Sequence, residues 1–180
     1  MYYTLIVKPG LKTRRRVTSL KKRISNEYGY IGTLSNKGVH ITLAYLKDYR
    51  HLDMDKVYNV CKNIKAFNIG FDGLDYFQRE KNGRIFYIVY LKVIYPYEFR
   101  RLHDLINDSL KDNVINSSEF VPHLSIARKN IHDDELNKIL EKYKNFKLDY
   151  EEKIDHILIG RRSSMEKRWN FKRVYFNDKF

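Results

Sequence analysis

Cysteine and long apolar runs are almost missing from this chain of 180 residues. Cys61 is the only cysteine, which excludes an intramolecular disulfide framework and favours a reducing compartment. No apolar run approaches the roughly 20 residues that a helix needs to span a bilayer. The apolar stretch at residues 1–7 is too short for a signal peptide. We therefore expect a cytoplasmic protein that has no membrane partner.

Motifs that mark several large enzyme classes are also missing. The chain has no His-Glu-x-x-His, no paired cysteines and no carboxylate cluster at metal-ligand spacing. It has neither a glycine-rich phosphate loop nor a Gly-x-Ser-x-Gly elbow, which argues against a nucleotide triphosphatase and a serine hydrolase. The sequence therefore predicts no metal and no cofactor.

Positive charge, in contrast, is abundant. Lys and Arg number 35 against 22 Asp and Glu, which gives a net charge of +13. This excess favours a polyanionic partner: RNA, DNA, a charged nucleotide or an anionic membrane. Two basic runs, Arg14–Arg16 and Lys21–Arg23, fall on the polar side of a predicted helix. We interpret them as a solvent-exposed helix face, in preference to a specific RNA groove.

Two short segments repeat one pattern of residues. They read Val-His-Ile-Thr-Leu-Ala from position 39 and Pro-His-Leu-Ser-Ile-Ala from position 122. Residues two apart share a face of a strand, so His40 lies beside Thr42 and His123 beside Ser125. If the two strands meet, two imidazoles and two hydroxyls converge on one cleft. The alternation assigns the other side chains to a core: Val39, Ile41, Leu43 and Tyr45 in the first segment, and Phe120, Leu124 and Ile126 in the second.

Hydrophobic periodicity and turn residues predict the elements around these segments. Asp53 is the expected N-cap of a helix, Asn82-Gly83 predicts a tight hairpin, and Cys61 is expected to be buried. The predicted helices are 12–28, 53–65, 97–111 and a helix capped by Asp133-Asp134 that runs through Tyr143; the predicted strands are 2–7, 38–46, 66–71, 74–78, 84–93, 121–128, 146–150, 153–161 and 169–176.

The order of these elements repeats. A helix precedes each histidine strand, and a second helix and then three strands follow it, with a period of about 83 residues, the separation of His40 and His123. Two unrelated strands that each carry a polar pair, the alternative interpretation, would not produce this repeat. We expect one bilobal α+β domain, residues 1–180, whose halves centre on the strands at 38–46 and 121–128. Each lobe would have an antiparallel sheet and helices, with a pseudo-twofold axis between the lobes and the active-site cleft at their junction.

The paired motifs resemble those of the two-histidine (2H) phosphoesterase superfamily, in the branch named for 2'-5' RNA ligase and 2',3'-cyclic phosphodiesterase (LigT-like). That family carries one His-x-Thr/Ser motif in each lobe of a bilobal α+β fold; here they are His-Ile-Thr-Leu from position 40 and His-Leu-Ser-Ile from position 123. Residues 120–128, Phe-Val-Pro-His-Leu-Ser-Ile-Ala-Arg, are similar to the branch's Phe-x-Pro-His-hydrophobic-Thr-Leu-Ala-Arg segment. The chain departs from the branch at Ser125, where Thr is commoner, and at Tyr45-Leu46-Lys47, where the branch often has Phe-Leu-Gly.

The two histidines suit acid–base catalysis, because imidazole, with a reference pKa of about 6.5, gives or takes a proton near neutrality. Transfer of a phosphodiester needs a base to activate the attacking oxygen and an acid to protonate the leaving oxygen. We predict that His123 is the base and His40 the acid; the symmetry of the site leaves the reverse assignment open. Thr42 and Ser125 are expected to donate hydrogen bonds to the non-bridging phosphate oxygens.

Further residues are candidate substrate contacts. The resemblance implies a basic residue at Arg128, although strict alternation puts position 128 on the core face unless the strand ends or bulges first. Arg161, together with Arg162, closes a predicted strand and is a candidate for lining the same cleft. The aromatic candidates for stacking on a base are Tyr30, Tyr45 and Tyr76.

The residues and the resemblance together predict a hydrolase: a metal-independent, monomeric phosphodiesterase that acts on RNA, an oligonucleotide or a cyclic nucleotide. Its expected reactions are opening of 2',3'-cyclic phosphate ends to a 2'-phosphate and cleavage of 2'-5' linkages. One alternative is a viral or phage-type hydrolase of 2'-5' oligoadenylate or cyclic oligonucleotide defence signals. The other is a non-catalytic RNA-binding module of the same fold, against which the acid–base pair argues because a pure binder does not need one.

Overall fold

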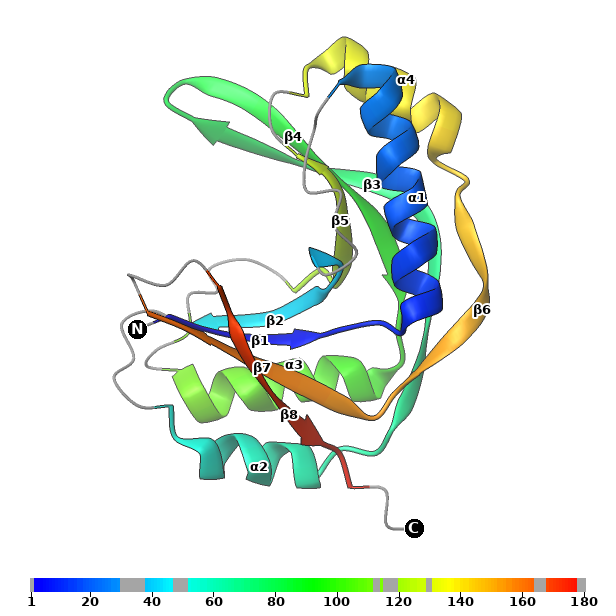
Figure 1. The fold of residues 1–180 in the computed structure, drawn as a ribbon. Helices are drawn as coiled ribbons and strands as arrows, with labels where there is room; N and C mark the ends of the chain where they lie inside the picture. The colour runs from blue at the N-terminus through cyan, green and yellow to red at the C-terminus, as the bar shows by residue number, and fades with distance from the viewer. Residues whose placement is uncertain are drawn as a thin grey trace.

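A computed structural model describes residues 2–29, 38–46, 52–111, 114, 120–128, 131–163 and 168–177. Within these residues the chain alternates strands and helices in the order that Figure 1 shows. The elements are β1 (Tyr2–Val7), α1 (Leu11–Tyr28), β2 (Ile41–Leu46), α2 (Met54–Lys62), β3 (Phe67–Lys81), β4 (Arg84–Ile94), α3 (Tyr97–Leu110), β5 (His123–Arg128), α4 (Asp133–Tyr143), β6 (Lys147–Ile154), β7 (His156–Arg162) and β8 (Asn170–Tyr175).

Two four-stranded sheets form the two lobes. The first has the strand order β2-β1-β7-β8 and the second has the order β5-β4-β3-β6. Every neighbouring pair of strands is antiparallel. The histidine-bearing strands β2 and β5 each occupy one edge of their sheet, and these two edges contact each other (Figure 1). The bilobal α+β architecture is therefore confirmed, but the lobes are not the two sequential halves of the predicted repeat, because β3 and β4 join the sheet of β5, and β7 and β8 join the sheet of β2.

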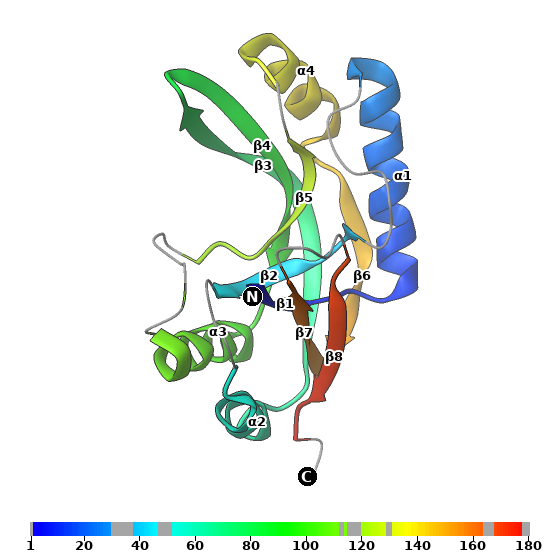
Figure 2. The same ribbon diagram turned by 60° about the vertical axis from the view of Figure 1, so that its left-hand side comes forward.

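Two of the helices are exchanged between the lobes. Helix α1 connects β1 to β2 of the first sheet but packs against β5 of the second. Helix α3 connects β4 to β5 of the second sheet but packs against β2 of the first. Figures 1 and 2 both show α1 on the side of the second sheet, next to α4 and β6. Each histidine strand is thus supported by a helix that belongs, by its connections, to the other lobe.

The sequence of α1 accounts for its length and its orientation. The helix starts after Pro9-Gly10 and ends at Gly29, whose φ of 84° lies in the left-handed region that favours glycine. Val17, Leu20 and Ile24 recur at helical spacing and are fully buried. This apolar stripe therefore fixes which side of the helix faces the second lobe.

Polar contacts hold α1 in place along its length. Near its start, Thr13 Oγ1 lies 3.1 Å from the hydroxyl of Tyr150 on β6. Near its end, Glu27 accepts hydrogen bonds from Lys142 (2.9 Å) and Tyr143 (2.7 Å) of α4. Because these contacts reach two different elements of the second lobe, α1 is anchored at both of its ends.

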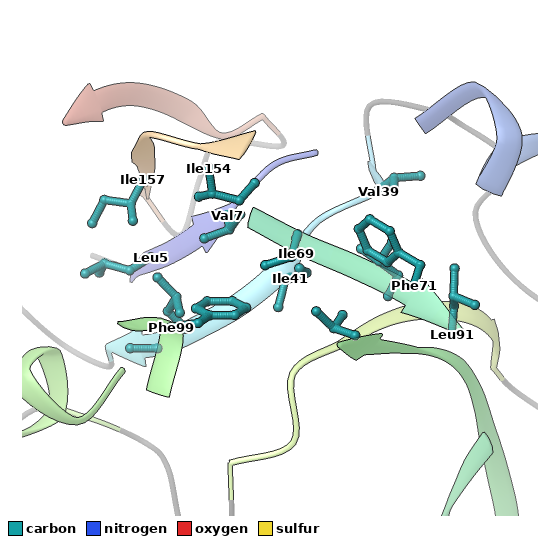
Figure 3. Close-up of a cluster of buried hydrophobic side chains, with 14 of the residues drawn as sticks. Leu5, Val7, Val39, Ile41, Ile69, Phe71, Leu91, Phe99, Ile154 and Ile157 are labelled. Atoms are coloured by element: carbon teal, nitrogen blue, oxygen red, sulfur yellow. The ribbon is translucent and has the colours of Figure 1, made fainter. Parts of the chain in front are cut away.

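One cluster of buried hydrophobic side chains joins the two lobes (Figure 3). It contains Leu5 and Ile157 from the first sheet, Phe71 and Leu91 from the second sheet, and Phe99 from α3. None of these five side chains is more than 1% exposed. Removal of apolar surface from water is the main favourable term in folding, so this cluster holds the two sheets together at their junction.

Several strand boundaries differ from the prediction, and in two places the chain is divided into strands differently. The strands predicted at 66–71 and 74–78 form the single strand β3, which is irregular around Gly73. Gly73 has a φ of 76°, and the backbone N–H groups of Gly73 and Leu74 bond to carbonyls of the segment before β6, so the chain continues without a turn. The strand predicted at 153–161 is divided at Asp155, because Lys153 and Ile154 belong to β6 and pair with β3.

Most of the capping and turn residues were predicted correctly. Asp53 caps α2 as predicted, since its carboxylate accepts hydrogen bonds from the backbone N–H groups of Asp55 and Lys56. Asn82 and Gly83 have positive φ values of 54° and 71°, as a tight hairpin requires. The N-cap of α4 is His132 and not the predicted Asp133-Asp134 pair, which forms the first helical turn. Cys61 is fully buried, and burial raises the pKa of its thiol to about 12.

None of the helices in the described part of the chain is both long and apolar enough to cross a membrane.

Candidate active site

The two predicted catalytic histidines are held in the same way at the starts of their strands. His40 directly precedes β2, and His123 is the first residue of β5. Nδ1 of His40 lies 3.0 Å from the carbonyl oxygen of Gly38, and Nδ1 of His123 lies 2.8 Å from the carbonyl oxygen of Val121. A carbonyl oxygen only accepts, so Nδ1 is assigned as the donor in both rings. In the neutral imidazole, Nε2 then keeps its lone pair for chemistry.

Tyr45 shares the exposed face of β2 with His40 and Thr42, which corrects its predicted place in the core. The register of β2 against β1 skips one residue, Leu43, between Thr42 and Ala44. Such a β-bulge reverses the alternation of the residues that follow it. The Tyr45 side chain is accordingly 45% exposed, whereas the residues on either side of it are buried.

A matching bulge occurs in β5. The register of β5 against β4 skips Ile126 between Ser125 and Ala127. Arg128 therefore lies on the exposed face together with His123 and Ser125, and its side chain is exposed. The bulge thus removes the objection from strand alternation to a role for Arg128 at the cleft.

The two bulges make the histidine strands equivalent along their whole length. In both strands two consecutive buried residues, Leu43-Ala44 and Ile126-Ala127, interrupt the alternation. This apolar pair, which ends in alanine in both copies, is the sequence signal from which the bulges were predictable. The equivalent exposed positions, each 83 residues apart, are His40 and His123, Thr42 and Ser125, and Tyr45 and Arg128.

Burial and positive charge act together on His40. Burial is the largest cause that lowers the pKa of this imidazole below its ordinary value of about 6.5. The hydrogen bond to the Gly38 carbonyl opposes this shift, and the nearby charges of Lys21, Lys8 and Arg128 add to it. Arg128 belongs to β5, and its effect on His40 agrees with the contact between β2 and β5.

Aromatic rings surround His123. The ring centroids of Phe77 and His123 are 5.0 Å apart in an edge-on arrangement, and Tyr90 lies at 5.3 Å. Phe77 also stacks on Tyr90 at 4.3 Å. Burial lowers the pKa of His123, the hydrogen bond to the Val121 carbonyl opposes this, and the charge of Arg79 lowers the pKa further. Both catalytic candidates are thus neutral bases near pH 7 in the free protein.

The packing of Phe77 and Tyr90 against His123 was not predicted from the sequence. The contact depends on the pairing of β3, β4 and β5, which places Tyr90 opposite Ser125. Strand pairing of this kind is not encoded in local periodicity. Of the predicted stacking candidates, Tyr76 is 41% exposed and packs edge-on against Tyr87 at 5.5 Å, whereas Tyr30 lies outside the described residues.

Lys21 corrects the interpretation of the basic runs as a solvent-exposed helix face. Its side chain is only 7% exposed, although Lys22 and Arg23 beside it are exposed as expected. Lys21 lies one helical turn after Val17 and one before Ile24, at the edge of the apolar stripe of α1. The position of this lysine next to the apolar residues of the helix is the sequence signal from which its burial could have been predicted.

The structure does not bring Arg161 close to the two histidines. Arg161 pairs with Tyr3 near the start of β1, whereas His40 adjoins the pair formed by Val7 and Ile41 at the other end of that strand. These ends are separated by about 13 Å of extended chain at roughly 3.3 Å per residue. The neighbouring Arg162 packs over the rings of Tyr2 and Trp169. A substrate contact by Arg161 stays a prediction.

Comparison with known proteins places this chain in a family. A sequence model of the 2'-5' RNA ligase superfamily matches residues 9–166. An RNA 2',3'-cyclic phosphodiesterase of Thermotoga maritima is 24% identical over 113 residues, and the match spans 60% of this chain and 59% of the length of that relative.

Solved structures share the fold at low sequence identity. The protein TT0787 of Thermus thermophilus superposes with a TM-score of 0.74 over 100% of both chains, at 13% identity. E. coli LigT complexed with 3'-AMP superposes with a TM-score of 0.69 over 97% of both chains, also at 13% identity. The family match covers most of the sequence. The chain therefore belongs to the 2'-5' RNA ligase superfamily of two-histidine phosphoesterases.

Proposed function

We propose that the protein is a metal-independent phosphodiesterase that opens 2',3'-cyclic phosphate ends of RNA or oligonucleotides to a 2'-phosphate, or cleaves 2'-5' linkages. The observation that carries this proposal is the matched pair His40 and His123. Each ring is oriented by a backbone carbonyl at Nδ1, which leaves Nε2 for proton transfer. A domain that only binds RNA has no need of two histidines oriented alike.

The proposed reaction needs two proton transfers around one phosphorus atom. Nε2 of His123 takes a proton from a water molecule, whose oxygen forms the new bond to phosphorus. The bond from phosphorus to the 3' oxygen breaks, and the protonated His40 gives its proton to that oxygen. The products are a 2'-phosphate and a 3'-hydroxyl. Burial, and after it the surrounding cations, lowers the pKa of His40, which makes its imidazolium a stronger proton donor.

The other residues of the exposed faces suit the charge that develops on the phosphate. Thr42 and Ser125 occupy equivalent half-buried positions next to the two histidines, from which their hydroxyls would donate hydrogen bonds to the non-bridging oxygens. Arg128 would add a guanidinium group near His40, with its fork of N–H donors. The net charge of +13 favours binding of a polyanionic substrate such as RNA.

The test of this proposal is an assay with EDTA present throughout. The protein is incubated with RNA ending in a 2',3'-cyclic phosphate, with 2'-5' oligoadenylate, and with cyclic dinucleotides. We expect conversion of the cyclic phosphate end, or of the 2'-5' linkage, and identification of a 2'-phosphate product by mass and by its resistance to a 3'-specific phosphatase. Binding to RNA without conversion of any substrate would contradict the proposal and favour a binding module. Conversion of a cyclic dinucleotide alone would favour a hydrolase of signalling nucleotides.

The lowered pKa values predict where the enzyme works best. An imidazole with a lowered pKa stays neutral to more acidic pH, so the base remains active there, and the acid loses its proton earlier as the pH rises. We therefore expect the optimum of kcat/KM on the acidic side of about 6.5. NMR titration of the histidine ring signals should give pKa values below the same figure in the free protein. Bound inorganic phosphate should raise both values. An optimum well above neutrality would contradict the prediction.

A further inference from the structure

We propose that Lys21 of α1 and Arg128 of β5 together form the anion site that holds the substrate's phosphate group beside His40. This inference rests on the proposed function, and it assigns a role to Lys21 that neither the histidine motifs nor the family match contains. Lys21 is inferred to be a phosphate-binding residue that takes no part in proton transfer.

The placement of Lys21 is the first observation that supports this site. The side chain is 7% exposed, and α1 packs directly against β5, the strand that carries Arg128. The charges of both Lys21 and Arg128 act on the imidazole of His40, and the charge of Arg128 acts on Lys21. Lys21 and Arg128 thus lie on two elements that pack together, and β5 also contacts β2, the strand that directly follows His40.

The second observation is that these cations do not pair with carboxylates. The ion pairs in the described part of the chain involve neither Lys21 nor Arg128. Burial, and after it the charge of Arg128, lowers the pKa of Lys21 to about 8. The ammonium group is thus still mostly protonated at neutral pH, although it is buried beside another cation. Two such cations are unfavourable together unless an anion is shared between them.

A row of hydrogen-bond donors on α1 extends the site. Arg14, Thr18 and Lys21 are spaced by four and three residues, so they lie on one side of the helix. The buried Nε atom of Arg14 and the buried Oγ1 atom of Thr18 have no hydrogen-bond partner. Buried polar atoms in folded proteins are nearly always paired, so the unpaired hydroxyl of Thr18, one turn before Lys21, points to a ligand that accepts hydrogen bonds, and Arg14 lies one further turn along the same side. A phosphate group with its flanking oxygens is such a ligand.

Inorganic phosphate tests the site without any catalysis. In the absence of phosphate, Lys21→Met should leave the melting temperature unchanged or raise it, because it removes an unpaired buried charge and keeps the length of the side chain. Phosphate should raise the melting temperature of the native protein, and this increase should be largely lost in Lys21→Met. Lys22→Met, an exposed neighbour on the same helix, is the matched control and should behave as the native protein does.

Kinetics on a 2',3'-cyclic nucleotide give the second readout. Loss of a charged hydrogen bond to phosphate should lower kcat/KM about 10- to 100-fold in Lys21→Met, mainly through a higher KM. Inhibition by inorganic phosphate should weaken by a similar factor. Lys21→Arg, which keeps the charge, should restore much of the loss, and the pH optimum should not move, as a binding role requires.

The outcomes separate this inference from the proposed function. If Lys21→Met is stabilised and inhibited by phosphate as strongly as the native protein, the anion site is wrong even when the enzyme is active. If phosphate binding depends on Lys21 but no substrate is converted, the site stands and the proposed reaction fails. Should Lys21→Met not fold, NMR of the lysine 13Cε signals in the native protein decides: phosphate must raise the pKa of Lys21, and an unchanged value overturns the inference.

Discussion

Replacing His40 or His123 with alanine is expected to lower kcat by about 10²- to 10⁴-fold, the usual contribution of one general acid or base. Both residues are partly exposed, and among the described residues each ring forms one hydrogen bond, to a backbone carbonyl, so their loss should leave the fold intact. The measurement is steady-state hydrolysis of an RNA 2',3'-cyclic phosphate end, with circular dichroism to establish folding. The double variant should lose little more than the worse single variant, because acid and base act as one unit.

A histidine outside the cleft gives the control for this experiment. His132 is exposed ahead of α4, and His132→Asn keeps a residue that is favoured at an N-cap. This variant should retain native turnover. Native turnover in both His40→Ala and His123→Ala would instead remove the basis for acid–base catalysis by this pair.

Replacing Phe99 with alanine is expected to lower the free energy of unfolding by about 3–5 kcal/mol, the range for large aromatic side chains removed from a core. Phe99 is fully buried in the cluster that joins the lobes. Its ring stacks on Phe67 at 5.3 Å and meets Phe120 edge-on at 5.9 Å, three residues before His123. Urea denaturation followed by circular dichroism measures the change.

Tyr97 provides the comparison on the same helix. It lies two residues from Phe99 and is 74% exposed, so Tyr97→Ala should change the free energy of unfolding by less than about 1 kcal/mol. A loss in Phe99→Ala as small as that expected for Tyr97→Ala would show that packing of the Phe99 ring contributes little to stability.

Much of the fold was predictable because its signals are local. The stripe of Val17, Leu20 and Ile24 predicts the helix that buries it, and Asn82-Gly83 predicts the hairpin between β3 and β4. The exception at Gly73 has a tertiary cause. Backbone hydrogen bonds to the segment before β6 hold the chain straight where the local sequence indicates a turn.

Part of the candidate site was also predictable from local sequence patterns, and part of it depends on tertiary packing. The positions of His40, Thr42, His123 and Ser125 on exposed strand faces follow from alternation, and the structure places them there. Tyr45 was misplaced because alternation assumes an unbroken register, which a β-bulge interrupts. Lys21 and Phe77 were missed because each acquires its place only when separate elements pack together.

The exchange of α1 and α3 between the lobes limits how the cleft can move. A hinge motion that widened the gap between the two sheets would have to separate α1 from β5 and α3 from β2 at the same time. Such a motion would also expose the apolar cluster that spans the junction. We therefore expect the two sheets to keep a nearly constant separation instead of opening and closing about a hinge. We also expect substrates of different size to be accommodated by movement of side chains, while the separation of His40 and His123 stays nearly constant from one turnover to the next.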